Sequence, residues 1–251
     1  MTKFIDQTRS INPNYFMWLD EKVDPTVEMI PSFMQDSNPD NENNSSYILN
    51  SNGMRCDEYK ENNSIIFAGC EYTMPIHLEV ENGWAFKTYL KTKKINDSYI
   101  SLSYPGASIT KIINNIFRYV DNFGNPETIV ALMPEIPRET GYWEDSKVFK
   151  PKIYRQAYDV PGNEHNTMAI PNNLPLPLMA LTYINSIRNL ETYCKSNNIN
   201  LVWTSWDFDT NDMLSFFNFK YYFNSNIYNI FSLQTDMGQS QISDMFIEKI
   251  K

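Results

Sequence analysis

The chain has 251 residues, which is enough for one sizeable core or for one domain with an extension. Hydrophobic residues make up 42% and aromatic residues 14%, so disorder over the whole length is not expected. A net charge of -9 argues against nucleic acid or an anionic membrane as the default partner, because both would repel the chain.

The cysteines and the N-terminus bear on the compartment. Cys56, Cys70 and Cys194 are an odd number at scattered spacing, which fits neither a disulfide framework nor a zinc site. The first residues lack the apolar core of a signal peptide, and no apolar run approaches the roughly 20 residues of a membrane helix. We therefore expect a soluble protein in a reducing compartment, cytoplasmic or associated with a virion.

The first part of the chain has the pattern of an arm followed by a linker. Residues 35–46 are polar and turn-forming, with no apolar side chain apart from one proline. The arm before them carries aromatic and apolar residues without clear periodicity, so we expect it to pack on the main domain. We divide the chain into an arm and linker at 1–46 and one domain at 47–251.

From Ser64 onward, short apolar runs alternate with helical stretches, which predicts an α/β fold with a mostly parallel sheet. The best-determined helix spans 109–120, where isoleucines recur every three or four residues. Ser108 is its expected cap, and Gly124 ends it. The other expected elements are strands at 65–68, 99–103, 128–133 and 200–206, a helix at 84–90 and a long helix with Leu181, Ile184, Ile187 and Leu190 on its core face.

Residues 138–173 are expected to form an irregular insertion. They are rich in Tyr, Pro and charge, and they are too long for an ordinary connection, which suggests a functional or capping role. Aromatic residues of this stretch, Trp143 among them, could line a sugar platform together with Trp206, because aromatic faces stack on carbohydrate. The alternative is that these side chains pack in the interior.

The carboxyl ends of the expected strands are where a ligand should bind, since loops and helix N-termini converge there. The segments at these ends are 69–73, 104–108, 134–138 and 206–210. Their polar groups make the edge acidic: Glu71 and Thr73, the Gly106 backbone, Glu135, Asp207 and Asp209.

Three short motifs lie before the first expected strand, at its end and at the end of the second. Residues 49–58 contain Asn-x-x-Gly-x-Arg-x-x-Glu, residues 66–73 read Ile-Phe-Ala-Gly-Cys-Glu-Tyr-Thr, and residues 103–108 read Ser-Tyr-Pro-Gly-Ala-Ser. Together they resemble the SGNH, or GDSL-type, hydrolase family, in a form common among phage-like proteins. They match a lead-in, the first block Gly-Asp/Cys-Ser-x-Thr and the glycine block. The resemblance covers roughly residues 47–206.

The resemblance implies a three-layer α/β/α fold with a doubly wound, flavodoxin-like sheet. It also implies hydrolysis of esters, often on carbohydrates, through a serine, an oxyanion hole and a late Asp-x-x-His. The chain departs from this pattern, because Glu71 stands at the serine position and no histidine follows His165. Glu135 stands where the asparagine-bearing block would follow the third strand. Of the family's catalytic positions, only the backbone donor of Gly106 has a counterpart in this chain.

Glu71 has three interpretations. It could be a catalytic base, it could bind Mg²⁺ or Ca²⁺ with the other carboxylates of this edge, or it could accept hydrogen bonds from the backbone of its own turn. We favour the last, because the carboxylate would then fill the anion site internally. Cys70 and His77 form a candidate thiol dyad, and the alternative is a buried structural cysteine.

The sequence therefore predicts an SGNH-hydrolase-like domain with a degenerate catalytic site. It would be a non-catalytic binding or structural module for a carbohydrate or acyl ester, without cofactor or metal. The alternative is an active carbohydrate O-acyl or acetyl esterase with an unusual nucleophile or a histidine beyond Lys251. A carboxylate about 4 Å from a developing oxyanion would cost on the order of 4 kcal/mol at an effective dielectric near 20, which disfavours the serine mechanism. The expected binding residues are Cys70, Thr73, Ser108, Trp143, Trp206 and Asp207.

Overall fold

The structure is a computed structural model of the chain. It describes residues 50–52, 54–75, 78–104, 107–136, 138–143, 148–153, 176–225 and 235–250. The expected arm at 1–46 lies outside these ranges, so the division into arm and domain stays a prediction.

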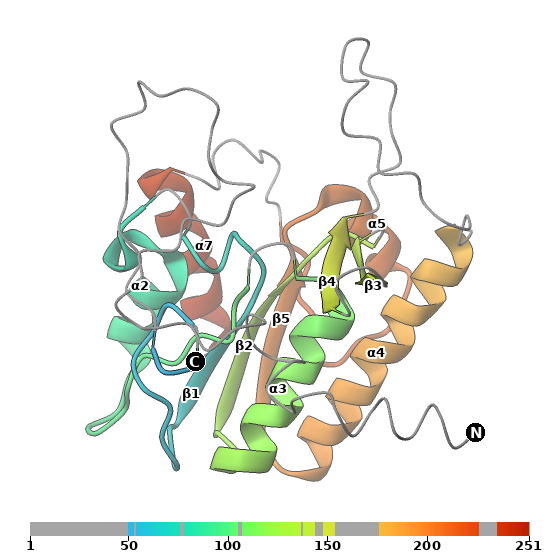
Figure 1. Ribbon diagram of the computed structural model, residues 1–251. Helices are drawn as coiled ribbons and strands as arrows, with labels where there is room; N and C mark the ends of the chain where they lie inside the picture. Colours follow the sequence, from blue (N-terminus) through green and yellow to red (C-terminus); the bar gives the residue numbers. More distant parts are fainter. Residues whose placement is uncertain are drawn as a thin grey trace, which may run out of the picture.

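A parallel sheet forms the centre of the fold (Figure 1). Its strands are β1 (Ile65–Gly69), β2 (Thr128–Met133) and β5 (Asn200–Ser205), in the order β1-β2-β5. Nearly every residue of the three strands is buried, as expected for a sheet that is covered on both faces. The prediction of a mostly parallel sheet is confirmed.

Two further segments extend this sheet at its edges. Residues 99–104 run parallel to β1, where Phe67 N donates to Ile100 O at 3.0 Å and Leu102 N donates to Phe67 O at 2.7 Å. Residues 221–223 run parallel to β5, where Phe223 N donates to Trp203 O at 3.1 Å. In chain order the segments lie 2-1-3-4-5, the order of flavodoxin-like doubly wound sheets. The predicted strand at 99–103 is thus present as an edge segment.

Helices cover both faces of the sheet and give three layers (Figure 1). One pair packs against β1 and β5 on one side, and a second pair packs against the same strands on the other side. A short helix follows β5 at the carboxyl edge. The helices are α2 (Trp84–Thr92) with α7 (Asp236–Ile250), α3 (Ile109–Phe123) with α4 (Leu176–Ser196), α5 (Phe208–Ser215) and the 3-10 turn η3 (Val80–Asn82).

Helix α3 forms as its sequence predicts. Ser108 is the N-cap, and its hydroxyl accepts a hydrogen bond from Lys111 N at 3.3 Å. Gly124 ends the helix with φ of 84°, a conformation that residues with a Cβ rarely adopt. Its isoleucines are buried against the sheet.

Helix α4 turns a different face to the core than we predicted. Leu181 is 52% exposed, whereas Tyr183, Ile187 and Leu190 are fully buried. These three residues lie three and four positions apart and share one face, and Leu181 lies outside it. The prediction is wrong for Leu181 and correct for Ile184, Ile187 and Leu190.

The predicted insertion is not irregular at its start. Strands β3 (Arg138–Trp143) and β4 (Val148–Ile153) form a separate two-stranded antiparallel sheet, in which Tyr142 pairs with Phe149. The two strands contain Thr140, Tyr142, Val148 and Phe149, which are residue types that favour β-strands. Residues 154–173 lie outside the described ranges.

Helix α7 is the last element that the structure describes. Helix α7 lies beside α2, where the rings of Trp84 and Phe246 stack with centroids 4.5 Å apart. Gln239 on α7 is buried and accepts a hydrogen bond from Trp84 N at 2.7 Å. Of the helices within the described ranges, none has the length and apolar character needed to cross a membrane.

Candidate functional site

The carboxyl ends of β1, β2 and β5 lie at one edge of the sheet. Tyr104 N donates to Gly69 O at 3.1 Å, so described residues of all four predicted segments meet at this edge. The turn after β1 begins at Gly69, and Thr73 folds back beneath it. A Cβ on Gly69 would lie 1.9 Å from Thr73 Oγ1 and 2.9 Å from Leu132 O. This close approach requires glycine and fixes the direction in which the chain leaves the strand.

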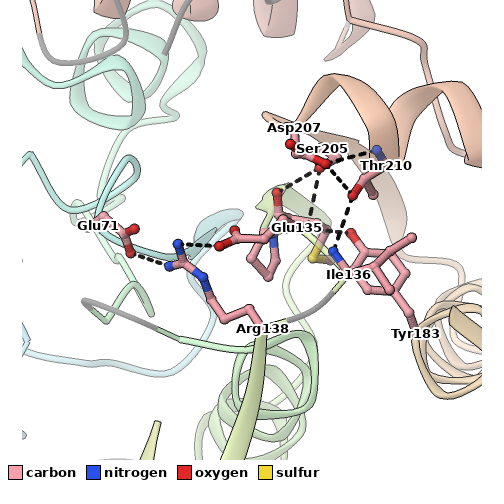
Figure 2. Close-up of polar contacts among 10 residues, drawn as sticks. Glu71, Glu135, Ile136, Arg138, Tyr183, Ser205, Asp207 and Thr210 are labelled. Atoms are coloured by element: carbon pink, nitrogen blue, oxygen red, sulfur yellow. Dashed lines mark hydrogen bonds and ion pairs between the residues drawn. The ribbon is translucent and has the colours of Figure 1, made fainter. Parts of the chain in front are cut away.

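A charged triad lies at the centre of this edge (Figure 2). Arg138 Nη1 is 2.6 Å from Glu71 Oε2, and Arg138 Nη2 is 2.9 Å from Glu135 Oε1. Glu71 comes from the turn after β1, Glu135 from the turn after β2, and Arg138 from the first position of β3. The predicted convergence of Glu71 and Glu135 is present, and a cation that we did not assign lies between them.

The triad is largely removed from water. The exposed fractions of the side chains are 2% for Arg138, 12% for Glu135 and 18% for Glu71. Burial alone would lower the pKa of Arg138, but the acidic groups around it raise that pKa, so the guanidinium keeps its charge. Burial raises the pKa of Glu135, partly offset by Arg138.

Trp206 closes one side of the triad. Its ring lies 5.7 Å from Arg138 Cζ, and its centroid is 4.7 Å from that of Tyr72. Trp206 is 5% exposed. The open, partly wet ring that a sugar platform requires is therefore not present at Trp206, because Tyr72 and Arg138 pack against it.

Asp207 does not join the triad. It is the N-cap of α5, and its carboxylate accepts hydrogen bonds from Thr210 N at 2.9 Å and from Thr210 Oγ1 at 2.7 Å. Thr210 Oγ1 in turn accepts a hydrogen bond from Ile136 N at 3.2 Å (Figure 2). Asp207 thus fixes the turn that carries Glu135. Asp209 is exposed in the first turn of the same helix.

Two further contacts hold the turn after β2. Tyr183 on α4 donates its hydroxyl to Pro134 O at 3.0 Å, and Ser205 Oγ donates to Met133 O at 3.2 Å (Figure 2). Both donor hydroxyls are buried, so few other groups can reach the carbonyl oxygens of this turn. The position of Glu135 is set by helices α4 and α5 together.

Cys70 is fully buried, and this burial raises the pKa of its thiol well above the usual range, with a further contribution from Glu71. A neutral, enclosed thiol is a poor nucleophile, which contradicts a reactive role for Cys70. His77, the other member of the predicted dyad, lies outside the described ranges.

The remaining predicted residues have separate positions. Ser108 caps α3, and Thr73 is buried beneath Gly69. Gly106 and the side chain of Trp143 lie outside what the structure describes. In the described part of the chain, no three His, Cys, Asp or Glu residues form a group that could hold a metal ion.

Several buried polar atoms around the triad lack a hydrogen-bond partner among the described residues. They are Thr73 Oγ1, Glu135 Oε2, Arg138 Nε and Trp206 Nε1. The triad therefore satisfies two of the three nitrogens of the Arg138 guanidinium, and it leaves one oxygen of Glu135 without a protein donor.

Arg138 is the functional residue that sequence reasoning missed. We placed residues 134–138 at the edge of the sheet but gave Arg138 no role. The signal was available, because two carboxylates that converge at a buried edge require a nearby cation. Chemically, the guanidinium forms an ion pair with each carboxylate, which leaves neither of them unpaired.

Comparisons with known proteins add one similarity. No protein-family model matches the chain, and no curated protein does. Among solved structures, the chain is similar to a protein from Desulfitobacterium hafniense DCB-2 assigned to the G-D-S-L lipolytic family. The TM-score is 0.45 and the sequence identity is 9%, over 75% of this chain and 99% of that one. The similarity concerns the fold alone.

Proposed function

We propose that the domain is an SGNH-hydrolase-like module with a degenerate site, which binds a ligand or supports an assembly and does not hydrolyse esters. The observation that carries the proposal is the ion pair between Glu71 and Arg138 at 2.6 Å. In the sequence resemblance, Glu71 occupies the position of the nucleophilic serine. A paired carboxylate at that position replaces the hydroxyl that the family's chemistry requires.

The chemistry of a carboxylate supports this proposal. Attack by Glu71 on an ester would form an anhydride and not a stable acyl-enzyme. If another nucleophile attacked, an ionised carboxylate about 4 Å from the developing oxyanion would oppose it by on the order of 4 kcal/mol at an effective dielectric near 20. The ion pair with Arg138 also occupies the carboxylate. Cys70, the adjacent thiol, is buried with a raised pKa and does not take over the role.

An esterase assay tests the proposal. We expect purified protein to release p-nitrophenol from p-nitrophenyl acetate no faster than buffer does. Glu71→Gln should match the wild type, as should Lys93→Ala, an exposed control at the C-terminal end of α2. Turnover that is lost in Glu71→Gln and retained in Lys93→Ala would establish the alternative, an active hydrolase with an unusual nucleophile.

We further propose a carbohydrate as the ligand. The proposal is supported by the aromatic content of strands β3 and β4 and of the residues that follow them in the sequence. Trp143 is the last residue of β3. Trp206 is not part of this platform, because its ring is covered. Titration calorimetry against a glycan panel should give a signal that Trp143→Ala removes and Lys93→Ala keeps. The absence of any signal across the panel would refute the sugar platform.

A further inference from the structure

The two-stranded sheet formed by β3 and β4, which we call the hairpin, is joined to the main sheet by no strand pairing among the described residues. An isolated two-stranded ribbon is only marginally stable in water. The hairpin must therefore be held by tertiary contacts. Helix α3 lies against β3, and Arg138, the first residue of the hairpin, contacts Glu71, Glu135 and the Trp206 ring.

The two ion pairs of Arg138 differ in what they connect. Glu135 is three residues before Arg138, and Arg138 N also donates to Glu135 O at 3.2 Å. This pair is local, and the short backbone tether keeps both partners within reach wherever the hairpin lies. Glu71 is 67 residues away, on the turn after β1. The pair with Glu71 exists only while the base of the hairpin lies on the carboxyl edge.

We propose that the Arg138–Glu71 ion pair is a latch that docks the base of the hairpin on the carboxyl edge of the sheet, and that the hairpin can leave this edge without unfolding the main sheet. The contact between Arg138 and the Trp206 ring is the second contact that depends on docking. When the latch opens, Arg138 stays paired with Glu135, so the buried guanidinium keeps a carboxylate partner.

The geometry provides matched variants. Glu71→Ala removes the connection to the β1 turn and leaves the pair of Arg138 with Glu135. Glu135→Ala removes the local pair and leaves the connection to the turn. Each variant removes one carboxylate and leaves one neutral ion pair, so the two carry the same charge change at the triad. Because neither leaves Arg138 without a carboxylate, both should fold.

Hydrogen–deuterium exchange of the full chain tests the latch. In the wild type, peptides that cover β3 and β4 should be protected. Glu71→Ala should increase the exchange rate of these peptides by at least about tenfold, while peptides of β2 stay protected. Glu135→Ala should change the hairpin rates by less than about twofold. This test does not depend on whether the domain hydrolyses or binds anything.

Other outcomes would overturn the proposal. Wild-type hairpin peptides that exchange like an unfolded chain would show that nothing docks the hairpin. Unchanged protection in Glu71→Ala would show that other contacts hold it. Equal release in Glu71→Ala and Glu135→Ala, or equal loss of protection in β2 and the hairpin, would show that the triad stabilises the whole domain.

Discussion

Glu71 and Arg138 form an ion pair of 2.6 Å across 67 residues of sequence, and the arginine is 2% exposed. Arg138 holds Glu135 at the same time, so two carboxylates share one buried cation. The triad carries one surplus negative charge. This composition determines how the site should respond to mutation and to pH.

Removal of the cation should be the most damaging change at this site. Arg138→Met leaves Glu71 and Glu135 facing each other in a buried setting, and we expect a loss of about 3–5 kcal/mol in the free energy of unfolding. Urea denaturation measures it. The triple variant Arg138→Met, Glu71→Gln, Glu135→Gln removes all three charges and should recover most of the loss. If the free energy of unfolding of Arg138→Met alone were within about 1 kcal/mol of the wild-type value, the result would contradict a buried triad.

Glu135 should make stability depend on pH. Burial raises the pKa of this carboxyl in the folded state, so the folded protein holds the proton more tightly than the unfolded chain does. Its stabilising contribution is complete below the unfolded pKa and is lost as pH rises through the folded pKa. Compared with the wild type, Glu135→Gln should therefore gain stability at neutral pH and lose that advantage under acidic conditions.

The comparison uses thermal denaturation of both proteins at several pH values from acidic to neutral. Taking the difference removes the contributions of the other carboxylates, which are common to both. A difference in melting temperature that stays constant with pH would mean that Glu135 is not the titrating group.

Gly69 should not tolerate a side chain. In Gly69→Ala the Cβ would lie 1.9 Å from Thr73 Oγ1 and 2.9 Å from the backbone oxygen of Leu132. The backbone oxygen belongs to the central strand and cannot move aside, so we expect a loss of about 3 kcal/mol. Chemical denaturation measures this loss. Thr73→Ala in the same chain removes one of the two clashes and should restore only part of the stability.

The sheet could be predicted from sequence, because three mostly apolar strands between helical stretches leave little choice beyond a buried parallel sheet. Helix α3 was also predictable, since its isoleucines, cap and terminal glycine agree. The prediction failed where periodicity alone decides: Leu181 was assigned to the core, which Tyr183 occupies instead. An amphipathic tyrosine is hard to assign to the core without knowing that Pro134 O accepts its hydroxyl hydrogen bond.

The sequence predicted where the site lies, but it did not predict which residues pair there. The topology rule located Glu71 and Glu135 at one edge, and the favoured role of Glu71 was to accept backbone hydrogen bonds. Its ion pair is with Arg138, because a buried carboxylate gains more from a cation than from neutral donors. Two carboxylates at a buried edge indicate that a cation lies nearby, but the sequence does not say which one, since Arg138 lies 67 residues from Glu71 and on a separate sheet.

Asp207 should act through helix capping. Asp207→Ala removes the acceptor of Thr210 N and Thr210 Oγ1, and we expect a loss of about 1 kcal/mol in the free energy of unfolding. Asp209→Ala removes an exposed carboxylate from the same helix and should change stability by less than about 0.5 kcal/mol. Urea denaturation of the two variants compares them. An equal effect would indicate that the charge at this edge matters and the cap does not.

Gln239 should connect the last helix to the turn that carries Glu71. Its Oε1 accepts from Trp84 N at 2.7 Å, and its Nε2 donates to Tyr72 O at 3.4 Å. Gly83, the N-cap of α2, has no side chain, so Gln239 supplies the cap from a different helix. Gln239→Leu leaves a buried N–H and a buried carbonyl without this partner, and the expected loss is about 1–3 kcal/mol.

Gln241 gives the matched control for this prediction. It lies on the exposed side of the same helix, so Gln241→Leu makes the same chemical change without removing a buried hydrogen bond. Urea unfolding followed by circular dichroism should show a lower midpoint for Gln239→Leu and a nearly unchanged midpoint for Gln241→Leu. Equal midpoints in the two variants would mean that α7 is held by its apolar contacts, such as Phe246 on Trp84, and that Gln239 contributes no net stability.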